Sequence, residues 1–142
     1  TCFKIESDQA ASKIRALINN CSERLDAPFD GEESITLYAD LEAGISGSMS
    51  SALLPEKIAP VIDHFWNNEK DKAEEIYNNI LPLINFENRQ CGFRATKTVM
   101  KEGGVIKSDF CRDPIKPLDL DTKNLLLNYA KRYDLLSYNW GK

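Results

Sequence analysis

The sequence contains a single histidine and only four cysteines, which are far apart and form no Cys-x-x-Cys pair. Structural zinc sites and disulfide-rich scaffolds need several such residues at short spacings, so the pattern indicates neither. Long apolar segments are also missing, since no run approaches the roughly 20 residues that cross a bilayer. The first residues do not show the positively charged stretch followed by an apolar stretch that is typical of a signal peptide. We therefore expect a cytoplasmic protein in a reducing setting, without a membrane partner.

Excess positive charge is another missing feature. The 18 Lys and Arg residues are outnumbered by 22 Asp and Glu residues, and no basic cluster is interleaved with aromatic residues. Such clusters form nucleic-acid surfaces, so we expect no nucleic-acid partner. The 142 residues, 42% of them hydrophobic, suffice for one ordinary domain with a core. An initiator methionine is absent and Thr1 already lies inside an expected strand, so we expect a piece of a longer protein.

Short apolar segments alternate with helical patterns in the first fifty residues. We expect strands over residues 1–7, 24–29 and 44–51, the last including its exit turn. Ser7 and Asp30 are the expected N-caps of the two helices between them. The apolar faces of these helices are formed by Ala10, Ile14, Leu17 and Ile18 and by Ile35, Tyr38 and Leu41. An order of strand, helix, strand, helix, strand predicts parallel strands, as in a barrel or a doubly wound sheet.

From residue 55 onward the patterns are helical. Pro55 suits the first turn of one helix, and a second helix from about residue 69 should kink or end at Pro82. Residues 88–102 predict a third helix with Phe93, Thr96 and Met100 on one side. An irregular loop over 105–118 follows, and Asp121 is the expected cap of a last helix. His64 lies off the apolar face of its helix without an evident carboxylate partner, so we expect a plain surface residue.

Lys4 is the residue in this pattern that is the strongest candidate for a catalytic nucleophile. It lies at the end of an expected buried strand, and in parallel α/β folds that edge of the sheet is where the chemistry occurs. Apolar neighbours would lower the pKa of the amine from about 10.4 toward neutrality, and a free amine can attack a carbonyl to form a Schiff base. Taken alone, however, a lysine at a strand end is usually a solvated surface residue.

Four segments, residues 3–6, 30–33, 82–90 and 101–106, carry a resemblance to a known family. The chain resembles the C-terminal half of the dihydrodipicolinate synthase and N-acetylneuraminate lyase family, and most of all its 2-keto-3-deoxy-L-arabinonate dehydratase branch. The resemblance implies an α/β fold, a partial TIM (β/α)8 barrel comprising strands six to eight, followed by a helical C-terminal extension. Residues 1–66 would be the barrel part and residues 67–142 the extension.

The resemblance also implies roles for five residues. Lys4 would be the Schiff-base lysine at the end of strand six. Gly31 would present a backbone group to the substrate, although a strand-to-helix turn alone would also favour glycine. Glu32 would face the hydroxyls of a sugar acid, although carboxylates also suit helix N-termini through the helix dipole. Ser48 and Ser50 would bind a carboxylate or hydroxyl, although close packing would also select small residues there.

The implied activity is that of a class I lyase that dehydrates a 2-keto-3-deoxy sugar acid without a metal or cofactor. A pyruvate-dependent aldolase or synthase such as dihydrodipicolinate synthase is the alternative within enzymes, and an inactive half-barrel fragment is the alternative outside them. The implied partners are a small 2-oxo acid, the missing N-terminal half of the same barrel and further copies in a homotetramer. The tyrosine that relays protons in the family lies on strand five, so no tyrosine of this chain receives a role.

Overall fold

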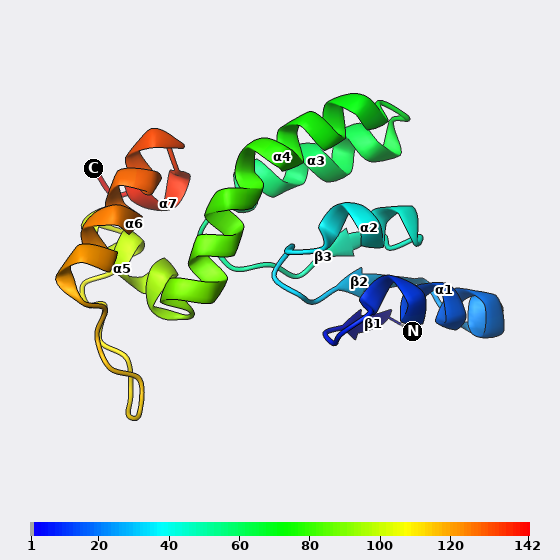
Figure 1. Ribbon diagram of the computed structural model, residues 1–142, viewed down its shortest axis with the longest axis horizontal. Helices are drawn as coiled ribbons and strands as arrows, with labels where there is room; N and C mark the ends of the chain where they lie inside the picture. Colours follow the sequence, from blue (N-terminus) through cyan, green and yellow to red (C-terminus); the bar gives the residue numbers. More distant parts are fainter. Residues whose placement is uncertain (1) are drawn as a thin grey trace. The chain divides into compact units, whose positions relative to one another are not determined.

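Three short parallel strands form a sheet near the start of the chain (Figure 1). The computed structural model describes residues 2–142, apart from the side chains of Ser22 and Ala27, so the expected strand position of Thr1 lies outside it. Strand β1 (Cys2–Ile5) pairs with β2 (Ala27–Asp30), and β2 pairs with β3 (Gly47–Ser48). The predicted α/β class with parallel strands is therefore confirmed.

Helix α1 (Ala10–Cys21) connects the first two strands and buries Ala10 and Ile14. The predicted N-cap at Ser7 is wrong, because the Ser7 hydroxyl accepts a hydrogen bond from Lys13 Nζ at 2.8 Å and Gln9, with φ 60°, precedes the helix. The second strand begins at Ala27 rather than at residue 24, since a 3-10 turn (Ser22–Arg24) follows α1.

Helix α2 (Leu37–Glu42) begins seven residues after β2 instead of directly behind Asp30. Glu33 and Ser34 have φ values of 53° and 67°, and this left-handed backbone cannot continue as a helix. The Asp30 carboxylate accepts hydrogen bonds from the backbone of Glu32 and Ser34, so it caps a turn over residues 31–36. Leu37 and Leu41 are the buried apolar residues of α2. Of the predicted face, Leu41 is buried, whereas Ile35 and Tyr38 are half-buried.

Helices α3 (Pro55–Trp66) and α4 (Lys70–Phe86) follow the sheet. Helix α3 starts at Pro55 as predicted and buries Ile58, Val61 and Phe65. Helix α4 does not end at Pro82 but continues through it to Phe86, and the two residues after the proline, Leu83 and Ile84, are completely buried. The expected kink at Pro82 stays a prediction. The expectation for His64 is also wrong in one respect, since its Nδ1 pairs with the Glu69 carboxylate.

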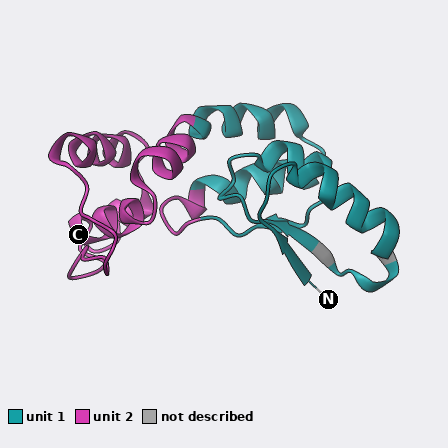
Figure 2. Ribbon diagram, turned by 60° about the horizontal axis from the view of Figure 1, so that its bottom comes forward, with its two compact units in different colours: residues 1–50, 57–81 teal, residues 51–56, 82–142 magenta. Residues whose placement is uncertain are grey.

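The chain divides into two compact units (Figure 2). The first comprises residues 1–50 and 57–81, and therefore contains the sheet, α1, α2, most of α3 and the first turns of α4. Within it, the Tyr38 ring lies 5.8 Å from the Phe65 ring and 6.4 Å from the Tyr77 ring, so aromatic contacts join α2 to α3 and α4. The proposed barrel boundary at residue 66 stays a prediction.

The second unit comprises residues 51–56 and 82–142. It contains a π-helix (Glu87–Cys91), α5 (Arg94–Glu102), α6 (Leu120–Arg132) and α7 (Leu136–Asn139). The predicted apolar side of residues 88–102 is wrong, because α5 buries Ala95, Thr98 and Val99, whereas Phe93 is 68% exposed. The cap of α6 is Asp119 rather than Asp121, since Asp119 accepts from the Thr122 backbone at 2.9 Å.

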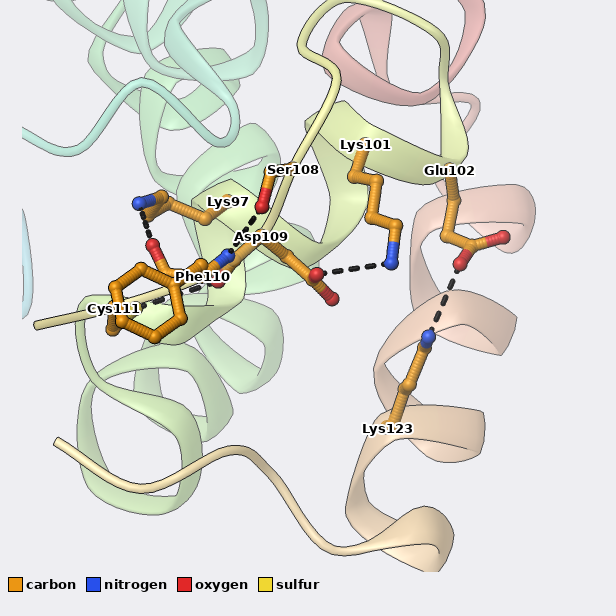
Figure 3. Close-up of polar contacts among 8 residues, drawn as sticks. All are labelled: Lys97, Lys101, Glu102, Ser108, Asp109, Phe110, Cys111 and Lys123. Carbon is orange, nitrogen blue, oxygen red and sulfur yellow. Dashed lines mark hydrogen bonds and ion pairs between the residues drawn. The ribbon is translucent and has the colours of Figure 1, made fainter.

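An irregular segment lies between α5 and α6, as predicted. Figure 3 shows how α5 holds it: Lys101 pairs with Asp109 at 2.9 Å, and Lys97 donates to the carbonyl of Phe110. Lys123 of α6 pairs with Glu102 of α5 at 3.1 Å. Across residues 2–142, every helix is too short or too polar to traverse a bilayer.

Candidate active site

Lys4 lies directly against Gly31 at the carboxyl edge of the sheet. A Cβ atom on Gly31 would lie 2.6 Å from Lys4 Cε and 2.7 Å from Lys4 Cγ, so the lysine side chain occupies the space that any larger residue would need. The Gly31 backbone N–H donates to the carbonyl of Ile5 at 2.8 Å, which continues the β1 to β2 pairing by one residue. Close approach of Lys4 is therefore one physical reason for a glycine at position 31.

The ionisation of Lys4 differs from the sequence prediction. Its Nζ pairs with Glu6 Oε2 at 2.7 Å, and this hydrogen bond raises the pKa of Lys4 above its ordinary value, against a smaller lowering by burial. The predicted lowering of the pKa is thus wrong in this structure, because β1 is not buried: the Lys4 side chain is 37% exposed and Phe3 is 44% exposed. An ammonium that reaches water and a carboxylate keeps its proton.

Asp30, which the sequence suggested only as a helix cap, holds the neighbouring segments together. It is completely buried, its Oδ1 accepts from the Glu32 backbone at 2.9 Å, and its Oδ2 accepts from the Ser34 backbone at 3.1 Å. The Ser48 hydroxyl of β3 donates to the same Oδ2 at 2.7 Å, and the hydroxyls of Ser34 and Ser48 are 2.8 Å apart. One carboxylate therefore joins β2, β3 and the turn that contains Gly31.

A second support for this turn comes from α4. The Tyr77 hydroxyl, which is buried, hydrogen bonds to the carbonyls of Ser34 and Ile35. Burial is the main cause that raises the pKa of Tyr77, and the nearby Asp30 and Asp40 carboxyls raise it further, so the phenol stays a neutral donor. The left-handed residues Glu33 and Ser34 are thus held from both sides, as strained backbone requires.

The structure brings four of the five residues singled out from the sequence to one edge. Contacts or hydrogen bonds link Lys4 to Gly31, and Asp30 to the Glu32 backbone and to Ser48. Ser50 follows β3 by two residues and is half-buried, and among the described residues no hydrogen bond joins it to this group. The bond of Asp30 to Ser48 and the bonds of Tyr77 to the turn were not predicted from the sequence, because the partners are 18 residues away for Ser48 and 43 residues away for Ser34.

Other polar features lie in the second unit. A cavity of about 460 Å³ is lined by residues of α5, α6 and the irregular segment, including Arg94, Asp109 and Lys123. The last two are already paired with Lys101 and Glu102, and Arg94 donates to the carbonyls of Cys91 and Lys116. Over residues 2–142, no three His, Cys, Asp or Glu side chains are grouped as metal ligands.

The sequence of residues 4–132 matches the model of the dihydrodipicolinate synthetase family. The chain belongs to this family. Lys4, Gly31, Glu32, Ser48 and Ser50 all lie within the matched residues. The resemblance drawn from the four sequence segments is therefore confirmed.

Two curated members of the family illustrate the range of relatives. The chain is 44% identical over 139 residues to L-2-keto-3-deoxyarabonate dehydratase of Azospirillum brasilense, covering 98% of the chain and 45% of that protein. It is 27% identical over 130 residues to 4-hydroxy-tetrahydrodipicolinate synthase of Trichlorobacter lovleyi, covering 90% of the chain and 43% of that protein. The chain thus spans less than half the length of these relatives. The first of them carries the name of the dehydratase branch that the sequence segments resemble.

The fold agrees with the family. The crystal structure of dihydrodipicolinate synthase from Rhodopseudomonas palustris superposes on 92% of the chain with a TM-score of 0.81 and 23% sequence identity. The aligned part is 45% of that structure. The partial TIM-barrel architecture predicted from the sequence is therefore supported at the level of the fold.

Proposed function

We propose that residues 1–142 are the C-terminal part of a (β/α)8 barrel subunit, with β1, β2 and β3 as strands six, seven and eight. The parallel order and the 45% coverage of relatives support this assignment. Parallel sheets are normally covered on both faces, yet Phe3 and Met49 are 44% and 45% exposed. The N-terminal half of the same barrel is the partner that would cover them. Assembly of complete subunits into a homotetramer is part of the same proposal.

We propose further that the complete subunit is a class I lyase acting on a 2-keto-3-deoxy sugar acid. The amine of Lys4 adds to the 2-oxo carbon, water leaves, and a protonated imine forms. Loss of a proton at carbon 3 then gives an enamine, which expels the hydroxyl at carbon 4 as water, and hydrolysis releases the product and Lys4. The observation that carries the proposal is Lys4 at the carboxyl edge, against Gly31, in a chain 44% identical to a dehydratase of this kind.

The raised pKa of Lys4 means that the amine must lose a proton before it can attack. The Glu6 carboxylate, 2.7 Å from Nζ, is the nearest base for that proton. In the complete barrel, coverage of β1 would also weaken the protonated form by removing water. Imine formation is therefore expected to speed up as the pH rises toward the pKa of Lys4.

Substrate contacts are proposed for Gly31, Glu32, Ser48 and Ser50. The Ser48 hydroxyl donates its hydrogen to Asp30, so toward a ligand it offers a lone pair. It is therefore suited to accept from a substrate hydroxyl rather than to donate to the substrate carboxylate. Glu32, which is half-buried and lies in the turn, is suited in the same way to sugar hydroxyls.

Borohydride trapping in the complete subunit tests the role of Lys4. With pyruvate or a 2-keto-3-deoxy acid present, reduction should give a stable adduct on the peptide that contains Lys4, and Lys4→Arg should abolish it. Arginine keeps the charge but is not a usable nucleophile, whereas a matched Lys13→Arg variant should be trapped normally. An adduct on Lys13, Lys57 or Lys97, or wild-type turnover by Lys4→Arg, would refute the assignment.

The second candidate is an aldolase or synthase of the same imine chemistry. It is favoured by the 27% identity to a 4-hydroxy-tetrahydrodipicolinate synthase. Assays of the complete subunit for dehydration of a 2-keto-3-deoxy sugar acid and for condensation of pyruvate with an aldehyde separate the two. Absence of both activities, together with absence of trapping, would favour the non-catalytic alternative.

A further inference from the structure

Two buried carboxyl groups accept hydrogen bonds from the turn over residues 31–36. Asp30 at the end of β2 and Asp40 in α2 are both completely inaccessible to water. Asp30 accepts hydrogen bonds from two backbone N–H groups and from Ser48, so both of its oxygens act as acceptors and the group fits a carboxylate. The charge of Asp30 is thus matched by donors.

Asp40 has a different environment. Its Oδ2 accepts from the Thr36 hydroxyl at 2.7 Å, whereas its buried Oδ1 receives no hydrogen bond from any donor among the described residues. Burial is the largest cause that raises the pKa of Asp40, the Thr36 bond opposes it, and a hydrogen-bond contact with Asp30 together with the charges of Asp30 and Glu32 raises the pKa further. Two adjacent carboxyls cut off from water cannot both ionise cheaply.

The charged and titratable groups around the pair give little compensation. Lys4 on β1 is attracted to Asp30, but its ammonium is held by Glu6. Glu32 in the turn adds negative charge, and Tyr77 on α4 is a neutral phenol that donates to backbone carbonyls. A proton on Asp40 is the simplest way to supply the donor that the arrangement lacks.

We propose that Asp40 keeps a proton and donates it through Oδ1 to the Asp30 carboxylate, and that this shared proton makes Asp40 a positioning residue for the Gly31 turn and Ser48. Asp30 can then hold the turn and β3 at the same time without repulsion from α2. Through Gly31, which touches Lys4, the pair sets the position of the lysine side chain. Only this last consequence, for Lys4 chemistry, rests on the proposed function.

Side-chain replacements separate this idea from mere packing. Asp40→Asn keeps the volume and provides an N–H donor to Asp30, so it should fold and should be trapped by borohydride at a rate within about threefold of wild type. Asp40→Leu removes the donor and should slow trapping, as should Asp30→Asn, whose amide cannot accept every bond made to Asp30. A displacement of Lys4 by about 1 Å corresponds to a loss of about 100-fold in trapping rate.

The decisive measurements do not require activity. Infrared difference spectroscopy of the complete protein at neutral pH should show a protonated carboxyl band that Asp40→Asn removes and Lys4→Arg retains. Thermal unfolding over a pH series provides the second readout. Because the pKa of Asp40 is raised on folding, wild type should lose stability relative to Asp40→Asn as the pH rises from about 3.9 through the folded pKa, and the difference should then level off.

Absence of the protonated carboxyl band, or a stability difference between wild type and Asp40→Asn that does not change with pH, overturns the proposal. Equal damage by Asp40→Asn and Asp40→Leu also overturns it, since Asn keeps both the volume and a donor, and its failure would indicate that the charge of the Asp40 carboxylate is what matters. If the band and the pH dependence are present while wild type cannot be trapped with any 2-oxo acid, the shared proton stands and the proposed function falls.

Discussion

Replacing Gly31 with alanine should displace Lys4 and identify the contact between them as functional. The added Cβ would lie 2.6 Å from Lys4 Cε and 2.9 Å from the Ile5 carbonyl oxygen. These separations are about 0.8 and 0.5 Å short of an ordinary van der Waals contact. The lysine side chain can rotate away, but the Ile5 carbonyl is backbone and accepts the Gly31 N–H at 2.8 Å. Both the side chain and the strand pairing must therefore adjust.

The expected cost of Gly31→Ala follows from this geometry. Overpacking of this size lowers the free energy of unfolding by about 1–3 kcal/mol. A shift of Lys4 by nearly 1 Å should slow imine trapping by about 100-fold in the complete subunit. The rate is measured by stopping borohydride trapping with pyruvate at successive times and quantifying the adduct on the Lys4 peptide by mass spectrometry. Denaturant unfolding measures the stability.

Gly92→Ala is the matched control for this prediction. Gly92 has φ 59°, so alanine there is strained by about 1–3 kcal/mol, but its added Cβ would meet no atom within 4 Å. It should lower stability to a similar extent and leave trapping unchanged. Normal trapping by Gly31→Ala, or an equal loss of trapping in both variants, would refute the reasoning about Lys4.

Three other predictions concern single features of the chain. Glu6→Gln removes the carboxylate that raises the pKa of Lys4. The pKa of Lys4 should therefore fall, and the pH profile of imine trapping should move to lower pH. An unchanged profile would show that the Lys4–Glu6 pair does not raise this pKa. Asp119→Ala removes the observed N-cap of α6 and should cost about 1 kcal/mol in thermal unfolding, whereas Asp121→Ala should cost much less. A polypeptide of residues 1–142 alone should self-associate or unfold, because Phe3 and the edge of β1 are exposed; a monomer that melts cooperatively, seen by sedimentation and calorimetry, would contradict this.

Local pattern in the sequence was sufficient for the family and for most of the secondary structure. The segments around Lys4 and Gly31 carry the family resemblance because they are contiguous, and the matched family model covers both. The strand order and the start of α3 at Pro55 follow from spacing and backbone preference within a few residues. These features depend on neighbours in the chain, so the sequence determined them without knowledge of the fold.

Tertiary structure decided the properties that depend on distant partners or on exposure. The pKa of Lys4 is raised rather than lowered because β1 is exposed and Glu6 reaches Nζ, which an apolar strand pattern does not reveal. From the sequence, Asp30 was expected to be a helix cap. In the fold it is buried and bonded to Ser48, 18 residues away, so it links β3 to the turn beside the candidate lysine. A carboxylate acquires such a role only when folding removes water and brings donors from separate strands to the same oxygen.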